Sequence, residues 1–424
     1  MMFQTYNKHK TKNMKNLKFY LPLFFALLLL SCKTNGSSSK SETLPVSEKY
    51  PPVETGQPNT AYLPAFAGQT RIAGVKTATP YEVKIIAEGL ARPWSVVPMP
   101  DGRLLITEKG GTLRIATADG TLSAAITGTL PNLNSGGQGG LQGLTLAPDF
   151  ETSRTLYFMF SEKGEQGNVA AVAKANLSAG ETRLENVQVI YRALPYWEKE
   201  MHYGGRLIFD RKGNLFVATG ERSVLPARYK AQSLDNALGK ILHITTDGKP
   251  VAGGPFANTP RVLAEIYSYG HRNPLGIDLH PATGELWVVE MGPRGGDELN
   301  LIQPGKNYGW PTVTYGIEYN GNTIGEGITA SEDTEQPVYY WDPVISPGGM
   351  TFYDSNIIPE WKNNLFIAGL SSKHIIRLVI RENKIVGEER LLEDQGQRIR
   401  DVAESNGALF AVTDEGRLYR IRKK

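Results

Sequence analysis

Residues 210–222 read DRKGNLFVATGER, in which a polar turn with glycine leads into a short run rich in β-branched and aromatic residues. Such a run of four to six residues is typical of a short β-strand that follows a turn. The pattern occurs in five other places: PDGRLLITEKGGTLRI (100–115), DFETSRTLYFMFSE (149–162), HPATGELWVVEMG (280–292), EWKNNLFIAGL (360–370) and ESNGALFAVTDEGRLYRI (404–421). Short strands at spacings of roughly 40 to 80 residues predict an all-β chain folded as a six-bladed β-propeller. A large β-sandwich or a pair of β-domains is the alternative on pattern alone.

The composition describes a folded globular protein without a nucleic-acid partner. Of the 424 residues, 40% are hydrophobic and 21% charged, which is ordinary for such a protein. The formal net charge is +3, but residues 1–31 contain five lysines and no acidic residue. The rest of the chain is therefore slightly acidic and gives no electrostatic support for nucleic-acid binding.

The N-terminal segment resembles a bacterial lipoprotein leader. Residues 19–30 form an apolar run, FYLPLFFALLLL, which is too short to span a bilayer and suits a signal peptide. The run ends in LLSC (29–32), which resembles a lipobox and predicts that Cys32 carries a lipid. The alternative is a signal peptide with a chance cysteine.

The predicted organisation is thus a lipoprotein signal peptide over 1–31, a flexible tether over 32–75 and a propeller over 76–424. Residues 33–60 are rich in Ser, Pro, Lys and Glu and show no apolar period, as expected of a tether. No second apolar run approaches the length of a membrane span. We therefore expect an exported, membrane-anchored lipoprotein facing the periplasm or the cell surface, held to the membrane by its lipid only.

Several common catalytic motifs are absent from the sequence. The five histidines after the leader have neither HExxH nor HxH spacing, and neither a GxSxG elbow nor a P-loop occurs. With Cys32 as the single cysteine, the chain has no haem-attachment motif and no zinc-thiolate cluster.

Four segments contain side chains that suit chemistry better than packing: MHYGGRL (201–207), YSYGHRNPLGI (267–277), EMGPRGGDELNLI (290–302) and GQRIRDV (396–402). Backbone carbonyls in a Gly-Pro turn with nearby carboxylates suit calcium, a hard cation. Alternating arginines on one strand face suit a ligand with several carboxylates. A histidine beside such groups is a candidate general base.

These segments, together with GKNYGWP (305–311) and PVYYWDPVISPGGMTFY (337–353), resemble the glucose/sorbosone dehydrogenase family of soluble aldose sugar dehydrogenases, which depend on pyrroloquinoline quinone (PQQ). The resemblance runs from about residue 88 to the C-terminus. It implies a six-bladed β-propeller enzyme that uses PQQ and Ca²⁺ to oxidise aldoses to lactones. Electrons would pass from the small-molecule sugar to an external acceptor.

The resemblance also implies a role for individual residues. His202 is the expected catalytic base, and Arg272 the expected stabiliser of charge on the quinone oxygen. The expected cofactor-binding residues are Gln138, Asn273, Tyr319, Arg398 and Arg400. The carbonyls of Gly292 and Pro293 are expected to bind the catalytic calcium, and Glu298 and Tyr308 a structural calcium. Trp341 is expected to line the substrate cleft.

Two positions depart from the family pattern. Where related proteins have a lysine for the cofactor carboxylates, FIAGLSSKHII (366–376) has Ser371, with Lys373 two positions on. The aspartate that precedes the catalytic histidine in glucose-oxidising members is Met201. Two other readings therefore remain: a cofactor-free propeller that binds glycans or a surface partner, and a calcium-dependent lactonase-like hydrolase.

Overall fold

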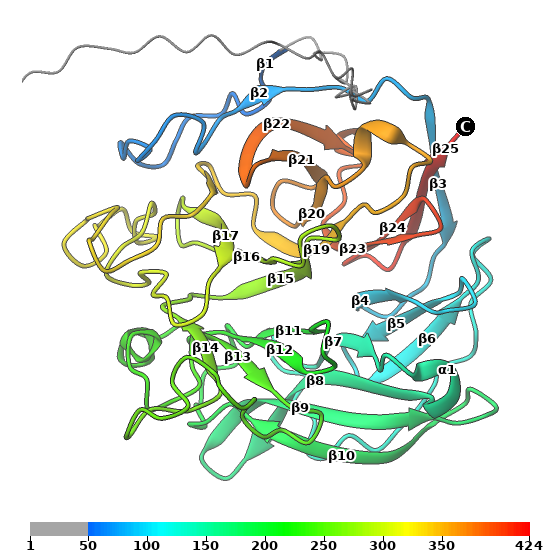
Figure 1. Ribbon diagram of the computed structural model, residues 1–424. Coiled ribbons are helices and arrows are strands. Elements are labelled where there is room, and N and C mark those ends of the chain that lie inside the picture. Colours follow the sequence, from blue (N-terminus) through cyan, green and yellow to red (C-terminus); the bar gives the residue numbers. More distant parts are fainter. Residues whose placement is uncertain (1–49) are drawn as a thin grey trace, which may run out of the picture. The chain divides into compact units, whose positions relative to one another are not determined.

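The computed structural model describes residues 50–424, and the predicted signal peptide, Cys32 and the first part of the predicted tether lie outside these residues. The described chain forms six β-sheets arranged around a common centre (Figure 1). The inner strands of neighbouring sheets contact one another in a closed ring, in the order β4, β7, β11, β15, β19, β23 and back to β4. This arrangement confirms the six-bladed β-propeller.

Each blade is built from antiparallel neighbours, some joined by short turns and others, such as β17 and β18, by long loops. From the inside outward, the blades are β4 (Pro93–Pro98), β5 (Leu104–Glu108) and β6 (Thr112–Ala116); β7 (Leu141–Leu146), β8 (Thr155–Gly164), β9 (Gly167–Leu177) and β10 (Leu184–Arg192); β11 (Gly204–Phe209), β12 (Leu215–Thr219), β13 (Lys240–Ile244) and β14 (Ile266–Tyr269); β15 (Pro274–Leu279), β16 (Leu286–Glu290), β17 (Asp297–Ile302) and β18 (Tyr339–Trp341); β19 (Pro347–Phe352), β20 (Leu365–Gly369), β21 (Ile375–Arg381) and β22 (Lys384–Leu391); and β23 (Ile399–Ser405), β24 (Ala408–Thr413) and β25 (Leu418–Lys423).

Helices are few and short in the described part of the chain. They are α1 (Phe150–Ser153) and α2 (Leu225–Arg228), with 3₁₀ turns η1 (Tyr229–Ala231), η2 (Pro359–Trp361) and η3 (Glu393–Gln395). None of the helices among residues 50–424 has the length and apolar character needed to cross a membrane.

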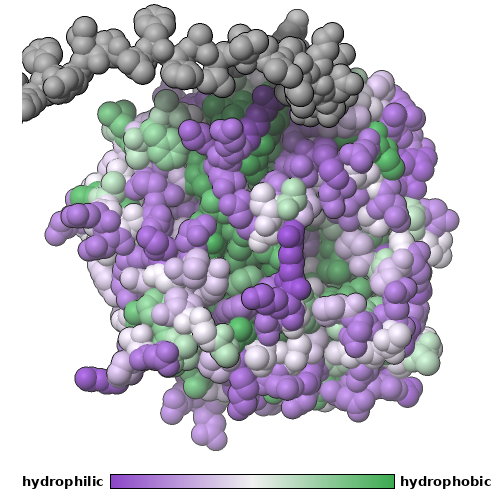
Figure 2. All heavy atoms as spheres, in the orientation of Figure 1, coloured by the Kyte–Doolittle hydropathy of each residue, from purple (hydrophilic) through white to green (hydrophobic). Residues whose placement is uncertain are grey.

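The six repeats of the sequence supply the second strand of every blade, and those at 100–115 and 404–421 also supply the third. In residues 210–222, the turn DRKGN precedes β12, which is completely buried because its two faces pack against neighbouring blades. Apolar clusters fill each interface between blades, and hydrophilic residues cover most of the surface seen in Figure 2, with hydrophobic ones visible deeper toward its centre.

An N-terminal strand closes the ring. β3 (Tyr81–Ala87) pairs antiparallel with β25 at the C-terminal end of the chain and becomes the outermost strand of the last blade. The blade is therefore completed by residues from both ends of the propeller, which leaves fewer unpaired strand edges.

The sequence predicts a flexible tether up to residue 75, and this prediction is wrong for residues 50–75. β1 (Tyr50–Pro52) and β2 (Ala73–Gly74) extend the sheet of β22, and the side chain of Gln69 is completely buried. Between these strands, Asn59 and Thr60 donate four hydrogen bonds of 2.7–3.0 Å to the carboxylate of Asp342. Residues 50–75, here called the N-terminal arm, are thus held by polar contacts. Because the arm has few apolar residues, its sequence did not indicate that it packs against the propeller.

Candidate active site

In each blade, antiparallel pairing places the start of the inner strand and the end of the second strand at the same end of the propeller. The start of an inner strand lies opposite the end of the second strand, as in the pairs Gly204↔Thr219 and Pro274↔Glu290. His202 and Arg272 each come just before an inner strand, and Arg398 occupies the same place in the last blade. The topology therefore gathers side chains that are far apart in sequence at one end of the propeller.

His202 is buried and held by neighbours on two sides. Its backbone N–H donates to Oε1 of Gln138 (2.9 Å), and its Nδ1 lies 2.7 Å from Oε1 of Glu221. Since a carboxylate accepts, Nδ1 carries the proton and Nε2 has its lone pair free. Burial lowers the pKa of His202 to about 4, and the charge of Arg272 acts in the same direction, while the hydrogen bond to Glu221 opposes both. The imidazole is therefore neutral at physiological pH and suits a general base.

Glu221 contacts His202 but is not among the residues predicted from the sequence. It lies two residues after β12, is almost completely buried, and accepts the backbone N–H of Ser223 as well as contacting His202. The available signal was its place in the repeat, since it directly follows the strand end and glycine in VATGER.

Arg272 extends over the turn that follows β16. Its Nη1 donates to the carbonyls of Met291 (2.9 Å) and Gly292 (2.6 Å), and its Nη2 donates at 3.4 Å to the hydroxyl of the exposed Tyr319. Its Nε is buried without a hydrogen-bond partner in residues 50–424. The carbonyl of Gly292 is therefore occupied by the guanidinium of Arg272, and a cation at this carbonyl would have to replace that contact.

Asn273 fixes the loop beside Arg272. Its Oδ1 accepts the backbone N–H of Gly204 at 3.0 Å, which ties the start of β15 to the start of β11. Two direct contacts thus join predicted site residues, Gln138 with His202 and Arg272 with Tyr319, and the charge of Arg272 is felt at His202.

Arg398 and Arg400 share one carboxylate, that of Asp414, which the sequence analysis did not single out. The two Nε atoms donate to it at 2.9 and 2.8 Å. Burial acts to raise the pKa of Asp414, but the two guanidinium groups hold it below its usual value. Both arginines remain partly exposed, with donors free for a further anion.

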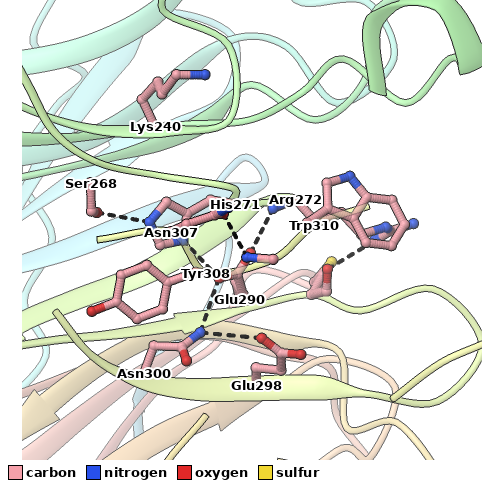
Figure 3. Close-up of polar contacts among 12 residues, drawn as sticks. Lys240, Ser268, His271, Arg272, Glu290, Glu298, Asn300, Asn307, Tyr308 and Trp310 are labelled. Atoms are coloured by element: carbon pink, nitrogen blue, oxygen red, sulfur yellow. Dashed lines mark hydrogen bonds and ion pairs between the residues drawn. The ribbon is translucent and has the colours of Figure 1, made fainter. Parts of the chain in front are cut away.

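A second cluster surrounds two buried carboxylates. Glu290 and Glu298 are directly opposite on β16 and β17, and the amide of Asn300 donates to both (Figure 3). Burial and the neighbouring Glu290 raise the pKa of Glu298 well above its usual value. Since like charges opposite each other destabilise a sheet, the pair suits a bound cation.

Tyr308 lines the same small cavity as these carboxylates. Its hydroxyl donates to the carbonyl of Leu301 and accepts from Gln303 N–H, and Figure 3 shows it pointing away from Glu290 and Glu298. Only its backbone carbonyl is left as a metal ligand. Within residues 50–424, three or more His, Cys, Asp or Glu side chains nowhere form a metal-binding group, so a calcium site would depend on such carbonyls.

Trp341 does not line a cleft, and this prediction is wrong. Its side chain is 2% exposed and packs in the apolar cluster between two blades. It lies on β18, the outermost strand of its blade, whereas the cluster around His202 lies at the ends of inner strands.

Ser371 and Lys373 also lie close to this end of the propeller. The hydroxyl of Ser371 is 2.8 Å from that of Ser346, and Leu370, the preceding residue, accepts from Nη1 of Arg398 at 3.3 Å. Lys373 is exposed, with no hydrogen bond or ion pair among the described residues.

Residues 90–420 match the model of the family described as glucose / sorbosone dehydrogenase. The chain belongs to this family of oxidoreductases. It is 41% identical over 347 residues to aldose sugar dehydrogenase YliI of Escherichia coli K12, covering 80% of this chain and 92% of that protein. The apo-form crystal structure of the soluble E. coli aldose sugar dehydrogenase matches with a TM-score of 0.77 and 40% identity, over 81% of this chain and all of that one.

A solved relative carries the quinone. The PQQ-bound aldose sugar dehydrogenase from Streptomyces coelicolor matches with a TM-score of 0.66 and 27% identity, over 82% of this chain and 99% of that one. Fold and family membership thus agree with the resemblance seen in the sequence.

Proposed function

We propose that this protein is a PQQ- and calcium-dependent sugar dehydrogenase that oxidises aldoses at the anomeric carbon to lactones. Electrons would pass to an external acceptor. The observation that carries the proposal is the buried, neutral imidazole of His202, which Glu221 orients beside Arg272. Membership of the family and the PQQ-bound relative support it.

When bound, PQQ supplies the two-electron oxidant that takes a hydride from the anomeric carbon. The chain must then remove the hydroxyl proton, and the free Nε2 of His202 is placed to accept it. Nδ1–H stays on Glu221, which stabilises the imidazolium that forms. If Nε2 of His202 did not accept this proton, loss of hydride would leave the sugar positively charged, which would oppose the reaction.

The donor set fits a quinone with several carboxylates. Arg272 supplies positive charge where negative charge develops on the cofactor oxygen. Arg398 and Arg400 have three donors on Asp414, and their remaining N–H groups suit a carboxylate. Asn273 and Tyr319 border the same space.

Calcium has two candidate positions. The carbonyls of Gly292 and Pro293 would hold one ion near the quinone, in exchange for part of the contact that Gly292 makes with Arg272. Glu298 and the Tyr308 carbonyl would hold another, with Glu290 as a third oxygen source.

The lipid anchor completes the proposal. Attachment at Cys32 would place the enzyme on the periplasmic or cell-surface side of a membrane, as the leader predicts.

The deciding experiment mixes purified apo-protein with PQQ and Ca²⁺ and follows reduction of a dye acceptor with a panel of aldoses. We expect turnover that needs both additions and stops on chelation. Quinone binding without turnover on any aldose would contradict the substrate assignment. No quinone binding by a folded protein would favour the cofactor-free binding module.

A further inference from the structure

Lys109 occupies a position in its blade that corresponds to that of Asp414 in the last blade. It is the first residue after β5, as Asp414 is the first residue after β24. Because Pro93 pairs with Glu108 and Ile399 with Thr413, both positions lie at the same end of the propeller. The topology therefore places Lys109 among the side chains of the candidate active site.

Three contacts fix Lys109 next to the loop of Gln138. Its Nζ donates to the carbonyl of Gly137 at 2.7 Å, its carbonyl accepts Leu141 N–H, and its own N–H donates to Arg92. The ammonium has two further N–H donors. No carboxylate among residues 50–424 lies within ion-pair distance of it.

The charges around Lys109 favour an anionic ligand. Burial and the charges of Arg92 and Arg400 lower the pKa of Lys109, and only Glu200 and Asp414 oppose this. Asp414 is already shared by the two arginines. The cluster of Arg92, Lys109 and Arg400 therefore has more positive charge than its neighbours neutralise.

We propose that Lys109 binds a carboxylate of the quinone and supplies the cation that Ser371 does not. The proposal rests on the proposed function. The side chain of Ser371 has no charge, is shorter than that of lysine, and is hydrogen-bonded to Ser346. It therefore cannot supply a cation for the quinone carboxylate. The blade of Arg398 and Arg400 has two neighbours in the ring: the blade of β20, which Ser371 follows, and the blade of β5, which Lys109 follows. In this protein the third positive charge would therefore come from the blade of β5 and not from the blade of β20.

The test is a titration of PQQ into calcium-loaded apo-protein, read by tryptophan fluorescence and independent of turnover. Losing one charge-assisted contact should weaken binding of Lys109→Met roughly ten- to a hundredfold. Lys109→Arg keeps the charge and should stay within about threefold of the parent. The control is Lys249→Met, which removes an exposed lysine from a turn in another blade and should bind like the parent.

A double-mutant cycle separates charge from structure. Adding Ser371→Lys to Lys109→Met should restore at least about tenfold in affinity, while the same change in the parent should add less. Equal binding by the parent and a folded Lys109→Met would overturn the role of Lys109 while leaving the proposed function intact. The role of Lys109 would also be overturned if Ser371→Lys failed to restore binding in Lys109→Met. If the parent protein itself bound no PQQ, the proposed function would be overturned.

Discussion

Nδ1 of His202 lies 2.7 Å from Oε1 of Glu221, and both side chains are almost completely buried. The two residues come from opposite ends of one β-hairpin, since His202 precedes β11 and Glu221 follows β12. The hairpin therefore sets both the tautomer and the direction of the imidazole, and no movement is needed to form the pair.

Replacing His202 with alanine should remove turnover but leave cofactor binding largely unchanged. A general base contributes about 10²–10⁴-fold to a rate, and we expect kcat to fall within that range. The comparison is His280→Ala, because His280 lies just beyond the other end of β15 from Arg272. If His202→Ala kept more than about a tenth of the parent kcat, His202 would not be the base.

The pH profile should show the low pKa of His202. The base must be neutral to accept a proton, so kcat/KM should rise with pH through a value of about 4 and then stay level toward neutrality. In Glu221→Gln the hydrogen bond that raises this pKa weakens, so the rise should move to lower pH and kcat should fall. An acid limb that stays in place in Glu221→Gln would show that Glu221 does not act through His202.

Calcium should stabilise the protein through Glu298. The pKa of Glu298 in the folded state lies above the ordinary value of 4.5, so with rising pH the unfolded state releases this proton first. The calcium-free protein should therefore lose stability as the pH rises above 4.5. At neutral pH, Ca²⁺ should raise the melting temperature of the parent by several degrees.

In Glu298→Gln this calcium effect should be much smaller, and the calcium-free variant should melt no lower than the parent. Glu326→Gln changes an exposed carboxylate and should respond to calcium like the parent. A full calcium response in Glu298→Gln would place the ion elsewhere.

Asp342 should be needed to hold the N-terminal arm. Asp342→Ala leaves the donors of Asn59 and Thr60 without their acceptor, which should cost about 2–4 kcal/mol in the free energy of unfolding. Limited proteolysis should cut residues 53–72 faster in this variant than in Asp333→Ala, which removes an exposed carboxylate. Unchanged cleavage in this segment would mean that other contacts suffice.

Cys32→Ser should release the protein from the membrane. The short apolar run before LLSC predicts a lipid at Cys32, and attached acyl chains would then hold the protein to the membrane. Fractionation of cells that express each form, with mass measurement of the N-terminal peptide, checks this. Membrane association that persists in Cys32→Ser would contradict the lipobox assignment.

The blades could be predicted because each copy of the turn-and-strand pattern carries its own local signal. The closure by β3 could not, since YEVKIIA pairs with a strand at the far end of the sequence and three of its residues are exposed. Long-range pairing of this kind leaves no mark in a local pattern.

A role could be assigned from the sequence where a motif contained the chemistry, as for His202 and Arg272, and these roles stay predictions. Glu221 and Asp414 were missed because each is an ordinary polar residue after a strand, and its partners are apparent only in the folded chain. Lys109, whose role is our proposal, occupies the same kind of position. Trp341 was misplaced because an aromatic residue in a matching motif does not reveal whether its strand is inner or outer.

The pairing of β3 with β25 also sets an order of events during synthesis. The ribosome releases Tyr81 early, but its partner strand β25 is made after every other strand of the propeller. Until then the final blade lacks its completed sheet, and the first blade lacks one neighbour. The ring therefore stays open until β25 is available to β3, and a chain exported as the leader predicts would complete its last blade only after residues 418–423 had followed the rest across.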